Sequence, residues 1–189
     1  MSDSGVPAEG ALEKYRQYLA LIARLQLDPQ WNGKVDLSGV VQQTLFEAHQ
    51  GQARFAGDES GARLAWLRRI LANNLADEIR KLNTDKRDVG RELSLEASVE
   101  QSSQRMEAWL AVEDTSPSGQ MHREELSLKL VAALQRLPEA QREALVLQHW
   151  QGWPLARIAE HMGKTRTAVA GLLKRGLQQL REEMRSANP

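Results

Sequence analysis

A run of cationic and hydroxyl side chains near the C-terminus has the composition of a surface that binds DNA. Residues 164–167 read Lys-Thr-Arg-Thr and directly follow Gly163, within the stretch PLARIAEHMGKTRTAVAGLLKRGLQQL (154–180). An arginine can donate two hydrogen bonds to the edge of a guanine, whereas lysine and threonine suit phosphate oxygens. The chemistry to expect is therefore non-covalent recognition of a polyanion.

The residue types that carry covalent or metal chemistry lack the spacing that such chemistry needs. The chain has no Cys, so disulfides and thiolate metal ligands are excluded. Its histidines show no metal-binding spacing such as H-E-x-x-H, and we expect each on the surface or at an interface: His49, His122, His149 and His161. No glycine-rich phosphate loop or nucleophile motif is present. We predict no catalytic residue, no metal and no cofactor, and therefore no enzyme.

The elements that must position residues 164–167 form a helix-turn-helix, in which two short helices pack at a steep angle. Gly163 is expected at the turn with a positive φ, and Thr165 is expected to cap the second helix. Small or apolar residues stand at the core positions: Ile158, Ala159, Met162, Val169 and Leu172. A two-helix hairpin without DNA binding can share this pattern.

The second helix of such a motif lies in the major groove of DNA with its first residues toward the bases. We expect these residues to face duplex DNA: Lys164, Thr165, Arg166, Thr167, Ala170, Gly171, Lys174 and Arg175. Arg166 is the expected reader of a base, and Lys174 and Arg175 suit phosphates. Gly171 either allows a closer approach to DNA or simply faces solvent.

The formal net charge of zero conceals a segregation of charge along the chain. Residues 63–91 carry 8 Lys/Arg and 4 Asp/Glu, residues 93–119 carry 1 and 5, and residues 120–189 carry 11 and 7. Two basic segments therefore flank an acidic one. Basic patches suit a polyanion, although solvated helix faces can carry the same charges.

The remaining pattern predicts an all-α fold. Apolar residues recur at helical spacing over 11–29, 35–51 and 63–82. In the longest of these segments the opposite face carries Arg69, Asn73, Asp77 and Arg80. Residues 93–119 lose strong periodicity and are rich in Ser and acidic groups, which predicts a flexible linker with a short helix possible at 105–112.

These elements predict two small helical domains, at 11–92 and 120–187, joined by the acidic linker 93–119. The second domain contains the helix-turn-helix. The chain has no apolar run of 18 residues, and MSDSGVPAEG at its start does not resemble a signal peptide. We therefore expect a cytoplasmic protein without membrane insertion.

Three segments together resemble the extracytoplasmic-function (ECF) group of bacterial RNA polymerase sigma factors. DLSGVVQQTLFEAH (36–49) resembles the helix that docks on the polymerase clamp. AWLRRILANNLADEIRK (65–81) resembles the helix that opens and reads the −10 element, and residues 134–184 resemble the −35 domain. The resemblance implies a subunit that binds the clamp and flap of core RNA polymerase and directs promoter-specific transcription initiation.

The resemblance also assigns residues to partners. It implies contact with core polymerase for Val41, Gln42, Gln43, Thr44 and Glu47. It implies contact with single-stranded −10 DNA for Phe55, Asp58, Arg69, Asn73 and Arg80. Trp66 is expected to pack in the core, and Asn74 either binds DNA or satisfies a neighbouring helix.

Other features of the resemblance concern regulation and specificity. Many members of the group are held by an anti-sigma factor, which makes such a protein a further expected partner. Relatives often have acidic residues where Gly39 and Gln43 stand, and a basic residue and a Ser where Ala170 and Gly171 stand. These departures imply fewer charged clamp contacts and more reliance on DNA shape. The alternative function is a stand-alone helix-turn-helix repressor or activator with an N-terminal dimerisation domain.

Overall fold

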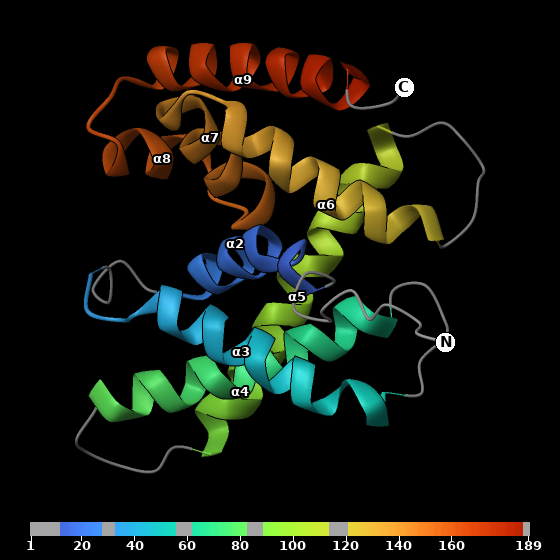
Figure 1. Cartoon of the computed structure of the whole chain (residues 1–189). Helices are drawn as coiled ribbons and strands as arrows, with labels where there is room; N and C mark the ends of the chain where they lie inside the picture. Colours follow the sequence, from blue (N-terminus) through green and yellow to red (C-terminus); the bar gives the residue numbers. More distant parts are fainter. Residues whose placement is uncertain (1–11, 28–32, 56–61, 83–88, 114–120, 187–189) are drawn as a thin grey trace. The chain divides into compact units, whose positions relative to one another are not determined.

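The computed structural model describes residues 12–27, 33–55, 62–82, 89–113 and 121–186. Every regular element in these ranges is helical (Figure 1), which confirms the predicted all-α fold. The chain divides into two compact units. The first comprises residues 1–103 with 118–124, and the second comprises residues 104–117 with 125–189. None of the described helices has the length and apolar character needed to cross a bilayer.

Three helices pack on one another in the first unit: α2 (Arg16–Gln26), α3 (Leu37–Gly51) and α4 (Ala62–Leu82). A short 3₁₀-helix (Gln52–Arg54) follows α3. The core comes from the apolar stripe of each helix, including Leu19, Ile22, Val41, Leu45, Leu64, Leu67, Leu71 and Leu75. The spacing of these residues by three or four is what places them on one side of each helix.

The start of α3 is set by local chemistry. Gly33 has a φ of +80° in the turn before the helix. Asp36 then caps the helix, because its Oδ1 accepts a hydrogen bond of 2.9 Å from the Gly39 amide. Asp36 is therefore the N-cap of α3. A Cβ at Gly39 would clash with the Asp36 carboxylate, so a glycine suits this capped turn.

The prediction of an irregular linker over 93–119 is wrong for its described part, because α5 is a continuous helix over Val89–Glu113. Residues of α5 up to Ser103 belong to the first unit, and those from Gln104 belong to the second. The buried positions of this helix are Val99, Ser102, Ser103, Met106 and Leu110, at helical spacing. Two of these are serines, which are polar residues in a buried stripe, and this is why the apolar periodicity was too weak to indicate a helix.

Helix α6 spans Met121–Arg136, and its residues from Glu125 onward belong to the second unit. The same unit contains α7 (Glu139–Leu145), a π-helix (Val146–Trp150), α8 (Leu155–His161) and α9 (Arg166–Ser186). Both α7 and α8 pack against α9. Pro138 and Pro154 stand immediately before α7 and α8. Gly152, at φ +69°, follows the π-helical segment and lies in the connection before α8. From α5, Arg105 donates a 2.9 Å hydrogen bond to the Trp150 carbonyl.

Candidate nucleic-acid interface

The helix-turn-helix predicted from the sequence is present in α8, the turn and α9. Ile158, Ala159 and Val169 are at most 5% exposed and form one cluster with Ala144 and Leu147. Met162 and Leu172 pack against the same cluster while remaining partly exposed. The core positions inferred from the sequence are therefore confirmed.

The turn and the helix start follow the local chemistry expected for such a motif. Gly163 has a φ of +61°, which glycine adopts without steric cost. Its amide donates to the Glu160 carbonyl at 3.1 Å, and the Lys164 amide donates to the Ala159 carbonyl at 2.9 Å. Thr165 Oγ1 accepts a 3.1 Å hydrogen bond from the Ala168 amide. This contact is the predicted N-cap of α9.

The predicted DNA-facing residues lie together on the first turns of α9 and the turn before it. All are exposed except Gly171, which is half-buried. The reason is Arg175, whose Nη1 lies 3.3 Å from the point where a Cβ on Gly171 would stand. Gly171 therefore does not face open solvent, because the guanidinium group of Arg175 covers it.

The cations of this surface form no ion pair with the part of the chain that the structure describes. Lys164, Arg166, Lys174 and Arg175 are exposed, and none of the four forms an ion pair with another described residue. Cations with no internal partner are available to phosphate oxygens, and each phosphate that they neutralise releases counterions from DNA. The arrangement is that of a recognition helix with a capped, cationic N-terminal end.

A second polar surface runs along α4 in the first unit. Arg69, Asn73, Asp77 and Arg80 are exposed on the face opposite the buried leucines, as the periodicity predicted. Arg80 is paired with Asp77, since its Nη1 lies 2.5 Å from Oδ1 of that residue. The positive charge of this face therefore comes mainly from Arg69. Asp58, assigned to the same site, lies outside the described residues.

Phe55 and Trp66 form a stacked pair beside this surface. Their ring centroids are 4.8 Å apart and their planes are inclined by 26°. The guanidinium carbon of Arg63 lies 5.7 Å from the centroid of the Phe55 ring. A Cβ at Gly51 would stand 3.1 Å from the Trp66 ring. Trp66 therefore packs within the unit, in agreement with the packing role inferred from the sequence.

The structure divides the residues assigned to polymerase docking into two groups. Gln42 and Gln43 are exposed on α3, and Glu47 is half-buried and accepts a 2.7 Å hydrogen bond from Gln43. Val41 and Thr44 are 2% and 0% exposed, so their side chains pack inside the unit and do not form part of a docking surface. This corrects the sequence-based assignment for these two residues.

The role of Asn74 also follows from this packing. Thr44 Oγ1 donates a hydrogen bond of 2.8 Å to the Val40 carbonyl, and it accepts one of 3.3 Å from Nδ2 of Asn74. Of the two roles considered for Asn74, satisfying the neighbouring helix is the one seen. Its side chain ties α4 to α3.

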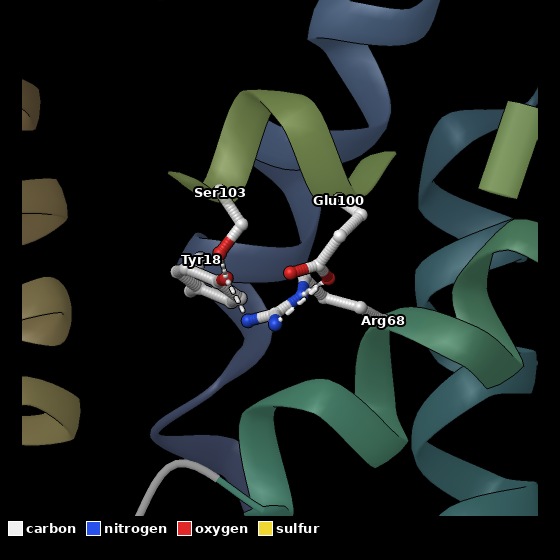
Figure 2. Close-up of polar contacts among 4 residues, drawn as sticks. All are labelled: Tyr18, Arg68, Glu100 and Ser103. Atoms are coloured by element: carbon white, nitrogen blue, oxygen red, sulfur yellow. Dashed lines mark hydrogen bonds and ion pairs between the residues drawn. The ribbon is translucent and has the colours of Figure 1, made fainter. Parts of the chain in front are cut away.

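Sequence reasoning missed a buried cation, Arg68, which is 6% exposed. Its Nε and Nη2 donate hydrogen bonds of 3.1 and 3.0 Å to Oε2 of Glu100, and its Nη1 donates one of 3.2 Å to the Tyr18 hydroxyl. Figure 2 shows these side chains converging from α4, α5 and α2, with Ser103 3.2 Å from the Tyr18 hydroxyl. The available signal was the position of Arg68, one turn after Leu64 on the apolar stripe.

The electrostatics keep this arginine charged. Burial by itself lowers the pKa of Arg68, but its contacts with Tyr18 and Glu100 outweigh this effect and raise the pKa above its ordinary value. The ion pair is asymmetric in exposure, because the Arg68 side chain is 7% exposed and that of Glu100 is 47% exposed. Solvent therefore reaches the carboxylate but not the guanidinium group.

An open groove lies beside this pair, between α4 and α5. Its lining comprises Ala65, Trp66, Arg68, Arg69, Glu96, Ala97, Val99 and Glu100. One wall is therefore aromatic and cationic, and the other carries two carboxylates. A second groove lies between α3 and α4, and it is lined by residues that include Gln43, Glu47, Asn74 and Arg80.

Comparison with known proteins finds one matching family and several similar proteins. Residues 127–180 match the family described as sigma-70, region 4. Over 161 residues the chain is 33% identical to "ECF RNA polymerase sigma factor SigG" from two strains of Mycobacterium tuberculosis, CDC 1551 / Oshkosh and H37Rv. That alignment covers 80% of this chain and 43% of the relative, so the chain spans less than half the length of the curated relatives it matches.

Solved structures with detectable similarity include two proteins seen in complex with partners. CnrH, in complex with the cytosolic domain of CnrY, is 24% identical, with a TM-score of 0.32 and coverage of 96% of this chain and 90% of that one. The sigma factor RpoE from Bartonella quintana, in complex with the anti-sigma factor NepR, is 20% identical, with a TM-score of 0.34 and coverage of 93% and 95%.

Proposed function

We propose that this chain directs promoter-specific transcription initiation. Its residues 127–180 match sigma-70 region 4, and over 80% of its length it is similar to an ECF sigma factor. In this role it binds core RNA polymerase, recognises the −35 and −10 elements and helps to open the DNA. The observation that carries the proposal is the capped α9 helix. It presents Arg166, Lys174 and Arg175 beside a complete helix-turn-helix core, with Lys164 in the turn before it, and none of these cations is ion-paired to another described residue.

The −35 element would be read as a duplex. Arg166, in the first turn of α9, is placed to donate hydrogen bonds to a base edge in the major groove. Lys164, Lys174 and Arg175 would hold phosphates and fix the register of the helix on the DNA. Ala170 adds no hydrogen bond, and this supports reading of DNA shape beside a small number of direct base contacts.

The −10 element would be held as a single strand along α4. Opening DNA requires that unpaired bases and their phosphates find partners that replace those in the duplex. Asn73 can bond a base edge through its amide, and Arg69 can contact phosphate or stack on a base. The resemblance also assigns Phe55 and Asp58 to the −10 strand. Arg80 would add less positive charge than Arg69, because Asp77 pairs with it.

Core polymerase would dock on α3 and on the second unit. Gln42 and Gln43 provide exposed amides for hydrogen bonds to the clamp, with Glu47 beside them. The flap is the partner that the resemblance implies for the −35 domain, and an anti-sigma factor is a further partner that we propose from the same resemblance. As a polymerase subunit the protein would work in the cytoplasm, would use no cofactor and would have no catalytic role of its own.

Run-off transcription tests this function directly. Core polymerase with the purified chain, on genomic promoter fragments, should start at defined positions that share −35 and −10 sequences. Arg69→Ala and Asn73→Ala should reduce opening of the −10 region, measured by permanganate reactivity of unpaired thymines, more than binding to a −35 duplex. Absence of specific start sites would refute the proposal. Tight binding to a two-fold symmetric site without polymerase would instead support a stand-alone regulator.

A further inference from the structure

The first half of α5 covers a face of α2 and α4 through contacts that are mostly polar. Gln26 donates a 3.0 Å hydrogen bond to Ser102 and accepts one of 2.6 Å from Ser98. Within residues 94–103, Val99 is the buried apolar side chain. When an interface opens, water can replace its hydrogen bonds, but exposing buried apolar surface to water is unfavourable and is not offset in this way. This half of α5 is therefore built to detach at moderate cost.

Beneath this helix lies the cation Arg68, next in sequence to the exposed Arg69 of the −10 surface. Both residues line the α4–α5 groove, and Glu100 and Glu96 stand on the opposite wall. Glu100 holds the guanidinium group of Arg68 through two hydrogen bonds. A guanidinium group binds a carboxylate and a phosphate through the same arrangement of donors. Glu100 therefore stands where a phosphate oxygen could bind.

We propose that residues 94–103 form a reversible cover over an anion-binding surface made by Arg68 and Arg69, where phosphates of single-stranded promoter DNA replace Glu100 once α5 is released. This inference rests on the proposed function and extends its −10 surface by one buried cation. The Tyr18 hydroxyl, which already accepts a hydrogen bond from Arg68, stays in place to orient the guanidinium group. Residues 94–103 thus exclude nucleic acid from this surface until this part of α5 detaches from α2 and α4.

A covalent lock on the cover provides the first test. The chain has no native cysteine, so Gln26→Cys with Ser102→Cys gives one pair for a short, reducible bifunctional crosslinker. The crosslinked full chain should bind a single-stranded −10 oligonucleotide at least tenfold more weakly than the same protein after reduction. Binding of a −35 duplex, followed by anisotropy on the same sample, should not change. Equal affinity for the single strand before and after reduction would overturn the proposal.

Charge removal on α5 provides the second test. Glu100→Gln should raise the affinity for the single-stranded oligonucleotide about threefold or more, because Arg68 loses its internal anion. Glu96→Gln is the matched control, because it removes the same charge from the same groove wall, one turn away. Equal effects of the two substitutions would show that net charge alone matters, and this would contradict the proposal.

A double-mutant cycle separates this effect from a loss of structure. Arg68→Gln combined with Glu100→Gln retains polar groups on both helices but removes the cation, so the gain from Glu100→Gln should disappear in that background. Thermal unfolding of each variant confirms that it is folded. If the gain persists without Arg68, the phosphate does not bind where we propose.

The two proposals fail in different ways. If the unmodified chain with core polymerase starts transcription at no defined site, the proposed function is wrong. If the locked and reduced proteins, each with core polymerase, open the same promoter equally well, only the cover over Arg68 is wrong.

Discussion

Two glycines of α9 should respond with opposite signs to the same substitution. Each Gly→Ala change within a helix gains about 1 kcal/mol of helix propensity. At Gly171 the nearest atoms to the new Cβ would be those of the Arg175 guanidinium group, with Nη1 at 3.3 Å, and this is the far end of a flexible, exposed side chain. The guanidinium group can move aside. Gly171→Ala should therefore stabilise the second unit by about 0.5–1 kcal/mol.

At Gly176 the same methyl group has no room. It would stand 3.1 Å from Cδ1 of Leu145 and 3.2 Å from Cβ of Gln141, where α7 packs on α9. Leu145 is 1% exposed, and a Cβ cannot move without its backbone, so the helices must separate. Overpacking of this kind costs about 1–3 kcal/mol. After the gain in propensity, Gly176→Ala should destabilise the unit by about 1 kcal/mol.

The measurement must report on the second unit, because the chain has two units that can unfold separately. Hydrogen exchange of the α9 amides in increasing urea gives the local free energy of unfolding. The two variants should differ by about 2 kcal/mol, which corresponds to roughly 8–16 °C in the melting temperature of a domain of this size. If both substitutions changed the free energy of unfolding in the same direction, the packing argument at Gly176 would be refuted.

Three further predictions concern the recognition helix and the α3–α4 contact. Thr165→Ala should cost about 1 kcal/mol in the exchange-derived stability of α9, with Thr165→Ser as the control that keeps the cap. Arg166→Ala should lose about 1–3 kcal/mol of discrimination at one −35 base pair, while Ala170→Arg should raise affinity and alter sequence preference, both read by run-off transcription on substituted promoters. If neither change affects initiation, α9 is not the reader. Thr44→Val should lower the urea midpoint by an amount equivalent to about 1 kcal/mol, since Asn74 loses its acceptor, but should leave affinity for core polymerase unchanged. A large loss of affinity for core polymerase would show that Thr44 does contribute to docking.

Much of the candidate site could be predicted from the sequence because its causes are local. Gly163 at positive φ and the Thr165 cap each depend on residues within one turn of the chain, and both are present as predicted. The leucine stripe of α4 also has a local cause. Residues three or four positions apart lie on the same face of a helix, whichever element packs against that face. This is why Arg69 and Asn73 could be assigned to the exposed face before the structure was known.

Only the tertiary structure decided which polar residues are buried. Ser102 and Ser103 are buried and bonded to side chains of α2, and residues 94–113 are therefore helical where their composition indicated a linker. Arg68 lies inside because Glu100 and Tyr18 form hydrogen bonds with it. Thr44 lies inside because its hydroxyl bonds the Val40 carbonyl within α3 and accepts a hydrogen bond from Asn74 of α4. A polar side chain can be buried only where a partner satisfies it. Apart from the Val40 carbonyl, these partners stand 30 or more positions away, so no local pattern in the sequence indicates them.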